Sequence, residues 1–242
     1  MGLNRFSPLA FMAVLALAGC YDAPPEQARP LPEDIRFDPA GPRPAPEVAA
    51  RNFMSVVARM EPIVEDECRA RTRGIVCDFN IVVDDRAGQP PNAYQTLDRT
   101  GRPIIAFTVP LIAEARNQDE LAFILGHEAA HHIEKHIPRQ SQQAMAGALL
   151  GGVLAAASGA DASAIRSAQD VGATIGARRY SKDFELEADE LGTVIAYRAG
   201  YDPLRGAAFF DRIPDPGNRF LGTHPPNADR IATVRRTLAS LR

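Results

Sequence analysis

The sequence predicts an α+β fold that is mainly helical, with a small β-sheet beside one central helix. The chain has 242 residues, 45% of them hydrophobic and 24% charged, as expected for one globular domain with an appendage. Apolar residues recur at helical spacing in several segments, whereas two short segments are rich in β-branched residues. The net charge of −3 comes without a basic stripe, so we expect no nucleic-acid partner.

The first 19 residues are typical of a lipoprotein export signal. Arg5 gives a short positive region, and residues 11–18 form an uncharged apolar run that is too short to span a bilayer. The run leads into the string Leu-Ala-Gly-Cys, which closes at Cys20 and resembles a bacterial lipobox. In such a site the cysteine becomes the lipidated first residue of the mature protein. A plain secretory signal with a chance cysteine is the alternative.

Residues 20–47 have the composition of a tether, with eight prolines and no apolar periodicity. In a polyproline-like state, at about 3.1 Å per residue, this segment would reach several tens of ångströms. The folded domain is then expected over residues 48–242. Tyr21 follows Cys20, where Asp would retain an enteric lipoprotein at the inner membrane. We therefore expect a periplasmic protein that a lipid anchors to the outer membrane.

Export changes what the other two cysteines, Cys68 and Cys77, are expected to do. They lie nine positions apart, and in an oxidising compartment a disulfide is the expected state. In the loop-entropy model, closing so short a loop contributes roughly 2–3 kcal/mol to stability. A metal site is the alternative, but no second pair of cysteine or histidine residues lies nearby.

A first helix is expected over 48–63, because apolar residues such as Phe53, Val56 and Met60 recur there at helical spacing. Residues 75–83 are rich in β-branched side chains and end at two aspartates, which favours a strand followed by a turn. Two consecutive prolines then predict a loop over 90–94.

A second strand is expected over 103–109, and Pro110 marks its end. The polar string 117–120 favours a helix start, so a helix should run over 118–136 and stop at Pro138. Helical spacing predicts four further helices, over 164–177, 184–199, 203–213 and 228–241.

Residues 141–160 contain no charge and much alanine and glycine. One interpretation is a membrane helix, and the other is a buried or lid helix of a soluble domain. The run is short, only moderately hydrophobic and interrupted by glycines, so the second interpretation is favoured.

The string His127-Glu128-Ala-Ala-His131 lies inside the helix predicted over 118–136. A spacing of four residues puts both imidazoles on one helical face, where they can bind one cation. Glu128 lies about 100° further round the helix, so it can contact a water beside that cation and act as a general base. Two neutral imidazoles, a carboxylate and a water suit Zn²⁺.

Two other histidines, His132 and His136, are also four positions apart. Isoleucine follows His132, so this second pair has no adjacent acidic residue that could act as a base. A polar helix end without a metal is the alternative interpretation of all four histidines.

The third ligand has to come from elsewhere in the chain. The metzincin pattern would need glycine and histidine where Glu134 and Ile137 stand, so that class is excluded. In the string 185–189, Glu185 and Asp189 share one helical face, so one helix could offer Glu185 to the metal and Asp189 to a ligand histidine. A solvated acidic face is the alternative.

These motifs, in this order, resemble a known family. The string His-Glu-Ala-Ala-His, the segment 180–189, and His224-Pro-Pro followed by Arg230-Ile231 are similar to gluzincin peptidases of the CAAX prenyl protease and HtpX type. The greatest similarity is to periplasmic members, the β-barrel assembly-enhancing proteases and related outer-membrane lipoproteins. The resemblance implies a zincin-like metalloprotease domain and favours Glu185 over Glu187 as the ligand.

On this interpretation one Zn²⁺ per chain is held by His127, His131 and Glu185, and Glu128 is the catalytic base. His224 would stabilise an oxyanion or cap the zinc. The strand over 103–109 would pair with an extended substrate. A surface loop is the alternative for His224.

The resemblance implies an endopeptidase that degrades misfolded or stalled envelope and outer-membrane proteins. Unfolded envelope proteins and the outer-membrane assembly machinery are the expected partners. A zinc-stabilised chaperone-like or binding module with little proteolysis is the alternative. A metal-dependent hydrolase of non-peptide substrates is a third interpretation.

Overall fold

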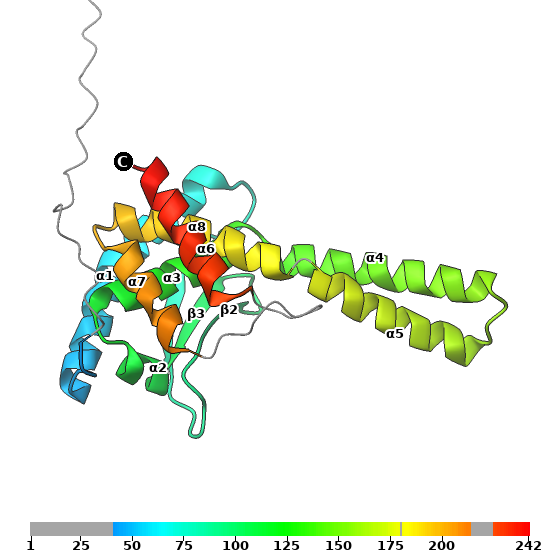
Figure 1. Cartoon of the computed structure of the whole chain (residues 1–242), viewed down its shortest axis with the longest axis horizontal. Coiled ribbons are helices and arrows are strands. Elements are labelled where there is room, and N and C mark those ends of the chain that lie inside the picture. Colours follow the sequence, from blue (N-terminus) through cyan, green and yellow to red (C-terminus); the bar gives the residue numbers. More distant parts are fainter. Residues whose placement is uncertain (1–40, 180, 214–224) are drawn as a thin grey trace, which may run out of the picture. The chain divides into compact units, whose positions relative to one another are not determined.

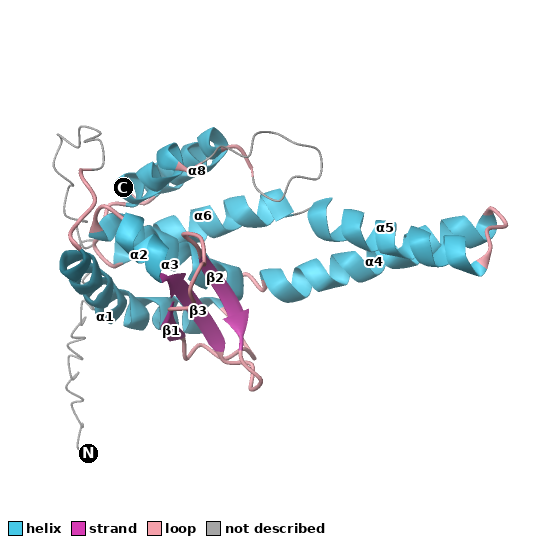
Figure 2. Cartoon of the chain, turned by 90° about the horizontal axis from the view of Figure 1, so that it is seen from below, coloured by secondary structure: helices cyan, strands magenta, loops and turns pink. Residues whose placement is uncertain are grey.

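The computed structural model describes residues 41–179, 181–213 and 225–242. Within these residues the chain is mainly helical with one three-stranded sheet, which confirms the α+β prediction (Figures 1 and 2). The elements are α1 (Pro46–Arg71), β1 (Asn80–Asp84), β2 (Ala93–Leu97), β3 (Pro103–Thr108), α2 (Val109–Glu114), α3 (Gln118–Ile133), α4 (His136–Ala157), α5 (Ala162–Arg179), α6 (Ser181–Arg198), α7 (Pro203–Ala207), the 3₁₀ turn η1 (Ala208–Arg212) and α8 (Asn227–Ser240).

Helix α1 is longer than the sequence predicts. It begins at Pro46, a proline in the first turn, where the missing N–H costs no helical hydrogen bond. It continues through Pro62 to Arg71 because its apolar face stays buried along its whole length. Near its end Cys68 forms a disulfide with Cys77, which ties α1 to the segment before β1.

The sheet has the order β1-β3-β2, with β1 parallel and β2 antiparallel to β3. Strand β2 begins at Ala93, inside the segment 90–94 that was predicted to be a loop. The two prolines stand just before it, so they do not interrupt its backbone hydrogen bonds. Strand β3 is therefore central and nearly all buried. The prediction that residues 103–109 offer a free edge to a substrate is wrong. Among the described residues, β2 has a neighbour on one side only.

Helix α3 lies at the centre of the domain, and twelve of its 16 residues are buried. Asn117 caps its start, where the Asn117 side chain accepts a hydrogen bond from the Glu120 N–H at 3.0 Å. The helix ends at Ile133, three residues before the predicted end. Lys135 then adopts a left-handed conformation with φ 57°, and α4 begins at His136. Pro138 falls in the first turn of α4, so it does not stop a helix there.

Helices α3 and α6 touch backbone to backbone at two glycines. A Cβ added to Gly126 would lie 2.9 Å from the Gly192 carbonyl oxygen, and one added to Gly192 would lie 2.8 Å from the His127 nitrogen. The absence of side chains at both positions lets α6 run directly over the α3 turn that carries the first histidine. This close contact positions the functional residues of the two helices.

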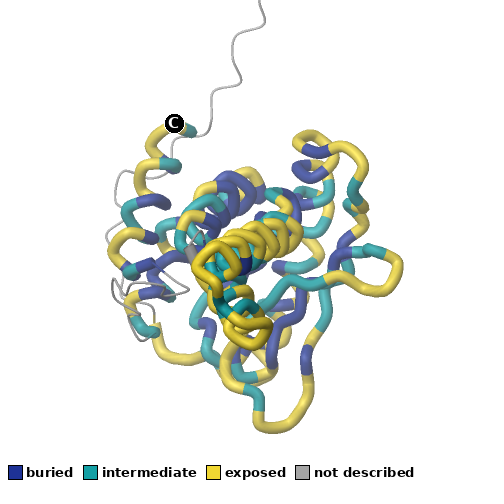
Figure 3. Tube along the Cα trace, turned by 90° about the vertical axis from the view of Figure 1, so that its right-hand side faces the viewer, coloured by how far each residue is buried: buried dark blue, intermediate teal, exposed yellow. Residues whose placement is uncertain are grey.

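Helices α4 and α5 pack along each other as a hairpin. Most of its residues are exposed or half-buried, and α4 buries only His136 and Gly152 (Figure 3). Of the buried or lid helix expected over 141–160, the buried form is therefore wrong, and the lid stays a prediction. Among the helices of the described residues, none combines the length and the hydropathy that a membrane span requires.

Candidate metal centre

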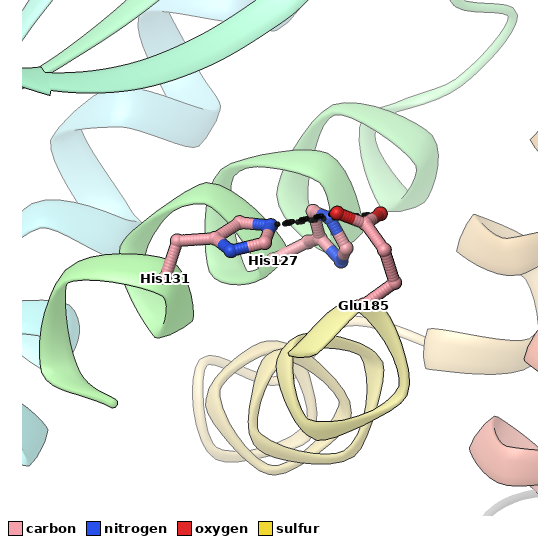
Figure 4. A group of neighbouring side chains, drawn as sticks. All are labelled: His127, His131 and Glu185. Atoms are coloured by element: carbon pink, nitrogen blue, oxygen red, sulfur yellow. Dashed lines mark hydrogen bonds and ion pairs between the residues drawn. The ribbon is translucent and has the colours of Figure 1, made fainter. Parts of the chain in front are cut away.

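Three predicted ligands come together in the structure, two from α3 and one from α6. The Nε2 atoms of His127 and His131 lie 3.1 Å apart. Each lies 3.5 Å from a carboxylate oxygen of Glu185. Figure 4 shows Glu185 reaching from α6 toward the two imidazoles on one face of α3. The helical spacing of four residues and the glycine contact between the helices produce this cluster.

The spacing of these atoms fits a small tetrahedral cation. Zinc with ligands at ~2.0–2.1 Å holds its donor atoms ~3.3 Å apart, with two imidazoles and a carboxylate as a common donor set. The two Nε2 atoms, 3.1 Å apart, lie close to that spacing, and each lies 3.5 Å from a different oxygen of the Glu185 carboxylate. Among the described residues, this is the group of histidine, cysteine and acidic side chains that could hold a metal ion.

The other ring nitrogen of His127 is held by Asp189. The Nδ1–H of His127 donates to the Asp189 carboxylate at 2.9 Å, and this contact turns Nε2 toward the cluster. Arg230 of α8 donates to both oxygens of that carboxylate at 2.7 Å. The sequence motif that contains Arg230 does not by itself assign this residue a role. Its place next to Asp189 depends on how α8 packs on α6, which no local pattern predicts.

The electrostatics of the pair of imidazoles favour one positive charge in the cluster. Burial opposes protonation of His127, but hydrogen bonds to Asp189 and Glu185 raise its pKa to about 10. Burial and the charge of His127 lower the pKa of His131 to about 3. The carboxylates therefore stabilise a cation at this position.

Glu128 lies beside the cluster and lines the same cavity, which has a volume of about 600 Å³. Burial raises the pKa of Glu128, as expected for a residue that must accept a proton near neutral pH. The backbone of Gln95 on β2 hydrogen-bonds the Glu128 carboxylate. The free-edge strand and the base thus lie on the same side of the cavity. Phe184, Phe209 and Phe210 give the cavity apolar walls.

The two other histidines of this segment, His132 and His136, make different contacts. His132 hydrogen-bonds the Val76 carbonyl oxygen at 2.7 Å, and it does not line the cavity. His136 turns back toward the site, where its Nδ1 lies 2.8 Å from Nδ1 of His131. The spacing of four residues pairs His136 with His132, but the break in the helix at Lys135 places it against His131 instead.

Several predicted site residues lie outside the described residues. These are His224, Cys20 and the export signal and tether up to residue 40. The resemblance favoured Glu185 over Glu187 as the ligand. In the structure Glu187 lies outside the ligand cluster and contacts His136 and Arg139.

The model of Peptidase family M48 matches residues 56–238, about three quarters of the chain. This range includes α3 and α6 and hence the whole cluster. None of the curated proteins matches the chain.

Proposed function

The chain belongs to peptidase family M48, and from this premise we propose that it is a zinc-dependent endopeptidase of the bacterial envelope. Family membership makes it a metallopeptidase, and peptidases of this family typically depend on zinc. The single observation that carries the proposal is the pair of Nε2 atoms 3.1 Å apart, each 3.5 Å from one oxygen of the Glu185 carboxylate, beside the buried carboxylate of Glu128.

In peptide hydrolysis the side chains of this site would have two roles, metal binding and proton transfer. Zinc held by His127, His131 and Glu185 would supply a Lewis acid that polarises the scissile carbonyl and acidifies water. Glu128 accepts the proton of the attacking water. It then returns this proton to the leaving amine nitrogen. The raised pKa of Glu128 suits both steps, because a weaker carboxylic acid holds the proton between them.

We place the substrate along β2 rather than β3. A chain that adds to the free edge of β2 would lie beside Gln95, whose backbone contacts Glu128. Edge addition uses backbone hydrogen bonds, so it selects extended, unfolded chains over folded ones. The aromatic side chains of the cavity would accept apolar residues of such a chain.

The location is proposed from the sequence of the N-terminal segment. An export signal over 1–19, lipidation of Cys20 and the proline-rich segment 20–47 would tether the domain to the outer membrane from the periplasmic side. Misfolded or stalled envelope and outer-membrane proteins are then the proposed substrates. These chains expose the unpaired backbone that edge addition requires.

The experiment compares the wild-type chain with Glu128→Gln on unfolded casein, with bound zinc measured in both proteins. Glu128→Gln preserves the shape of the residue and removes its basicity. We expect equal zinc content and a loss of cleavage of at least about a hundredfold. Equal cleavage by both proteins would disprove the role of Glu128. Zinc binding without cleavage by wild type would favour a chaperone-like module.

A further inference from the structure

His136 lies against a proposed metal ligand although it sits on a different helix. Lys135 is the one non-glycine residue with a positive φ among the described residues, and this conformation separates α3 from α4. The turn brings the first residue of α4 back over the last turn of α3. As a result, Nδ1 of His136 lies 2.8 Å from Nδ1 of His131.

The positions of the protons in this contact follow from the donors and acceptors that the ring nitrogens can offer. Two ring nitrogens at hydrogen-bond distance need one donor and one acceptor. Ligation of zinc through Nε2 of His131 puts its proton on Nδ1, so His131 donates and His136 accepts. The proton of His136 is then on Nε2, which lies 3.1 Å from a carboxylate oxygen of Glu187. Arg139 donates to both oxygens of Glu187.

Packing holds the ring of His136 in this orientation. The ring is 4% exposed and stacks on Phe184, with ring centroids 4.6 Å apart and planes at 11°. Phe184 and Glu187 both belong to α6, which also carries Glu185. Helix α6 therefore contributes a ligand, the surface against which His136 packs, and the carboxylate to which His136 donates.

We propose that His136 is a positioning residue that orients His131 for metal binding, through a hydrogen-bonded chain from Glu187 to His136 to His131. The proposal rests on the proposed zinc site. Each ligand histidine then has its own hydrogen-bond partner on the ring nitrogen that faces away from the metal. Asp189 is the partner of His127, and His136, itself bonded to Glu187, is the partner of His131. Such partners typically change metal affinity by 10–100-fold.

The first test measures the zinc dissociation constant of the full chain by competition with a chelator. In His136→Leu, His131 loses its acceptor, so the constant should rise by roughly 10–100-fold. In His136→Asn, the amide oxygen can stand where Nδ1 stood, so most of the affinity should return. The control is His132→Gln, which can still donate to the Val76 carbonyl and should leave the constant unchanged.

Equal zinc affinity in His136→Leu and wild type would overturn the proposal, whereas a wild-type chain without zinc would overturn the proposed function itself. A second measurement needs no variant. The ¹⁵N–¹H spectrum of the imidazoles in the zinc-loaded chain reports which nitrogen carries each proton. We expect His136 protonated on Nε2 and His131 on Nδ1, and the opposite pattern at His136 would contradict the chain of hydrogen bonds.

A separate observation concerns the hairpin of α4 and α5. Its two helices touch through small residues: a Cβ added to Gly147 would lie 2.1 Å from the Gly172 carbonyl oxygen, and one added to Gly151 would lie 2.3 Å from that of Ala168. Backbones this close leave no space for large side chains between the helices. The large apolar side chains of α4 therefore point outward.

These outward side chains form what we term the α4 face, which is exposed and uncharged. No acidic or basic residue lies between Gln140 and Ala160. The outer side of α5, by contrast, carries the exposed Arg166 and Asp170. The hairpin is thus uncharged along α4 and mixed along α5, which also exposes Val171 and Ile175. The members of the α4 face are Met145 (72% exposed), Leu149 (69%), Leu150 (61%), Val153 (55%) and Leu154 (62%).

We infer that the α4 face lies on the surface of a lipid bilayer, an inference that rests on the proposed lipidation of Cys20. The tether between Cys20 and α1 allows at most roughly 80 Å of reach, so an anchored domain stays next to the membrane. A face about 14 Å long made of apolar side chains needs no specific partner atoms in the acyl–headgroup boundary.

The chain's cysteines allow a direct test in the lipidated full-length protein bound to vesicles of phosphatidylethanolamine and phosphatidylglycerol. With Cys20 lipidated and Cys68 joined to Cys77, an introduced cysteine is the only free thiol. A dye on Leu149→Cys should be quenched several-fold more strongly by brominated acyl chains than one on Met54→Cys. Met54 is the matched control, because it lies on α1 and is also 69% exposed.

Adding Leu150→Asp and Val153→Asp should reduce quenching at position 149 to the level at position 54. Equal quenching at both positions in wild type would overturn the inference. Disulfide-linked dimers of the unlabelled Leu149→Cys protein after mild oxidation, with no quenching of the labelled protein, would show that a second copy covers the face and would overturn the inference. A chain that does not attach to vesicles would overturn both the inference and the proposed anchoring, but not the peptidase.

Discussion

Asp189 and Arg230 form a buried ion pair that holds His127 from behind. Both side chains are nearly inaccessible to solvent, and the guanidinium binds the carboxylate through two hydrogen bonds of 2.7 Å. Removing one partner from such a pair leaves an uncompensated buried charge, which typically costs about 3–5 kcal/mol. The ion pair therefore couples the orientation of a metal ligand to the docking of α8.

We expect Arg230→Met to lower the free energy of unfolding by about 3–5 kcal/mol, because the buried Asp189 keeps its charge without the guanidinium that balances it. Urea unfolding of both proteins measures the difference. The double variant Arg230→Met with Asp189→Leu removes both charges and should recover much of the loss. A single variant as stable as wild type would show that solvent reaches Asp189.

The carboxylate of Asp84, which lies outside the metal centre, predicts that the stability of the fold depends on pH. The hydrogen bond from Arg86, aided by Tyr94, holds the pKa of Asp84 well below its usual value. A carboxyl with a lowered folded-state pKa stabilises the fold above its unfolded value of about 3.9. This contribution is lost as the pH falls toward the folded-state pKa.

Asp84→Asn should therefore lower the urea midpoint at pH 7, and the difference from wild type should shrink at pH 3. The exposed neighbour offers a control, Asp85→Asn, which should change neither midpoint. A difference for Asp84→Asn that is the same at both pH values would mean that its charge does not contribute.

Much of the site could be predicted from residue types and spacing. His127, His131 and Glu185 were expected together because helical periodicity fixes which side chains share a face, and the family resemblance selected Glu185. Arg230 and His136 could not be assigned in this way. Arg230 acts through a contact across 41 positions, and His136 depends on one backbone conformation at Lys135.

At the scale of elements, the contact between α3 and α6 sets the geometry of the metal centre. The two helices supply the ligands, and Gly126 and Gly192 let their backbones meet. Helical propensity alone disfavours glycine at such positions by about 1 kcal/mol. Packing outweighs propensity here, because a larger residue would move Glu185 away from the histidines.

Gly192→Ala should push α6 away from α3, since the new Cβ would lie 2.8 Å from the His127 nitrogen. We expect weaker zinc binding and a lower unfolding temperature. Gly152→Ala is the matched control, because its Cβ would meet only the flexible side chain of Gln169. Its exposed helix should be unchanged or slightly more stable. Zinc affinity that is equal in the two variants would contradict this account of the contact.

The predictions of helix and strand boundaries that were wrong have physical causes. The helix start at 118 was predictable from the Asn117 cap, but the helix end was not, because Pro138 is tolerated in a first turn. Strand β2 was missed because it is short and half-buried and shows no clear alternation. The exposed α4 resembles a buried helix in composition, and composition does not report the environment.

At the scale of the whole molecule, a helical domain of peptidase family M48 joins α3, α6 and α8 around one cavity, with β2 along its side. The proposed tether and the α4 face would keep that domain at a membrane surface. A substrate must then offer unfolded backbone near the membrane, which describes an envelope protein that has failed to assemble. Substrate choice would follow from exposure of backbone more than from a sequence motif.

The most direct test of this account is a zinc titration of the metal-free full-length chain, with casein cleavage recorded at each step. We predict no cleavage without zinc and a rise that saturates at one equivalent per chain. The same titration of Glu185→Gln should give weaker binding and little activity. Full cleavage by the metal-free chain, or activity that is independent of Glu185, would contradict the central claim.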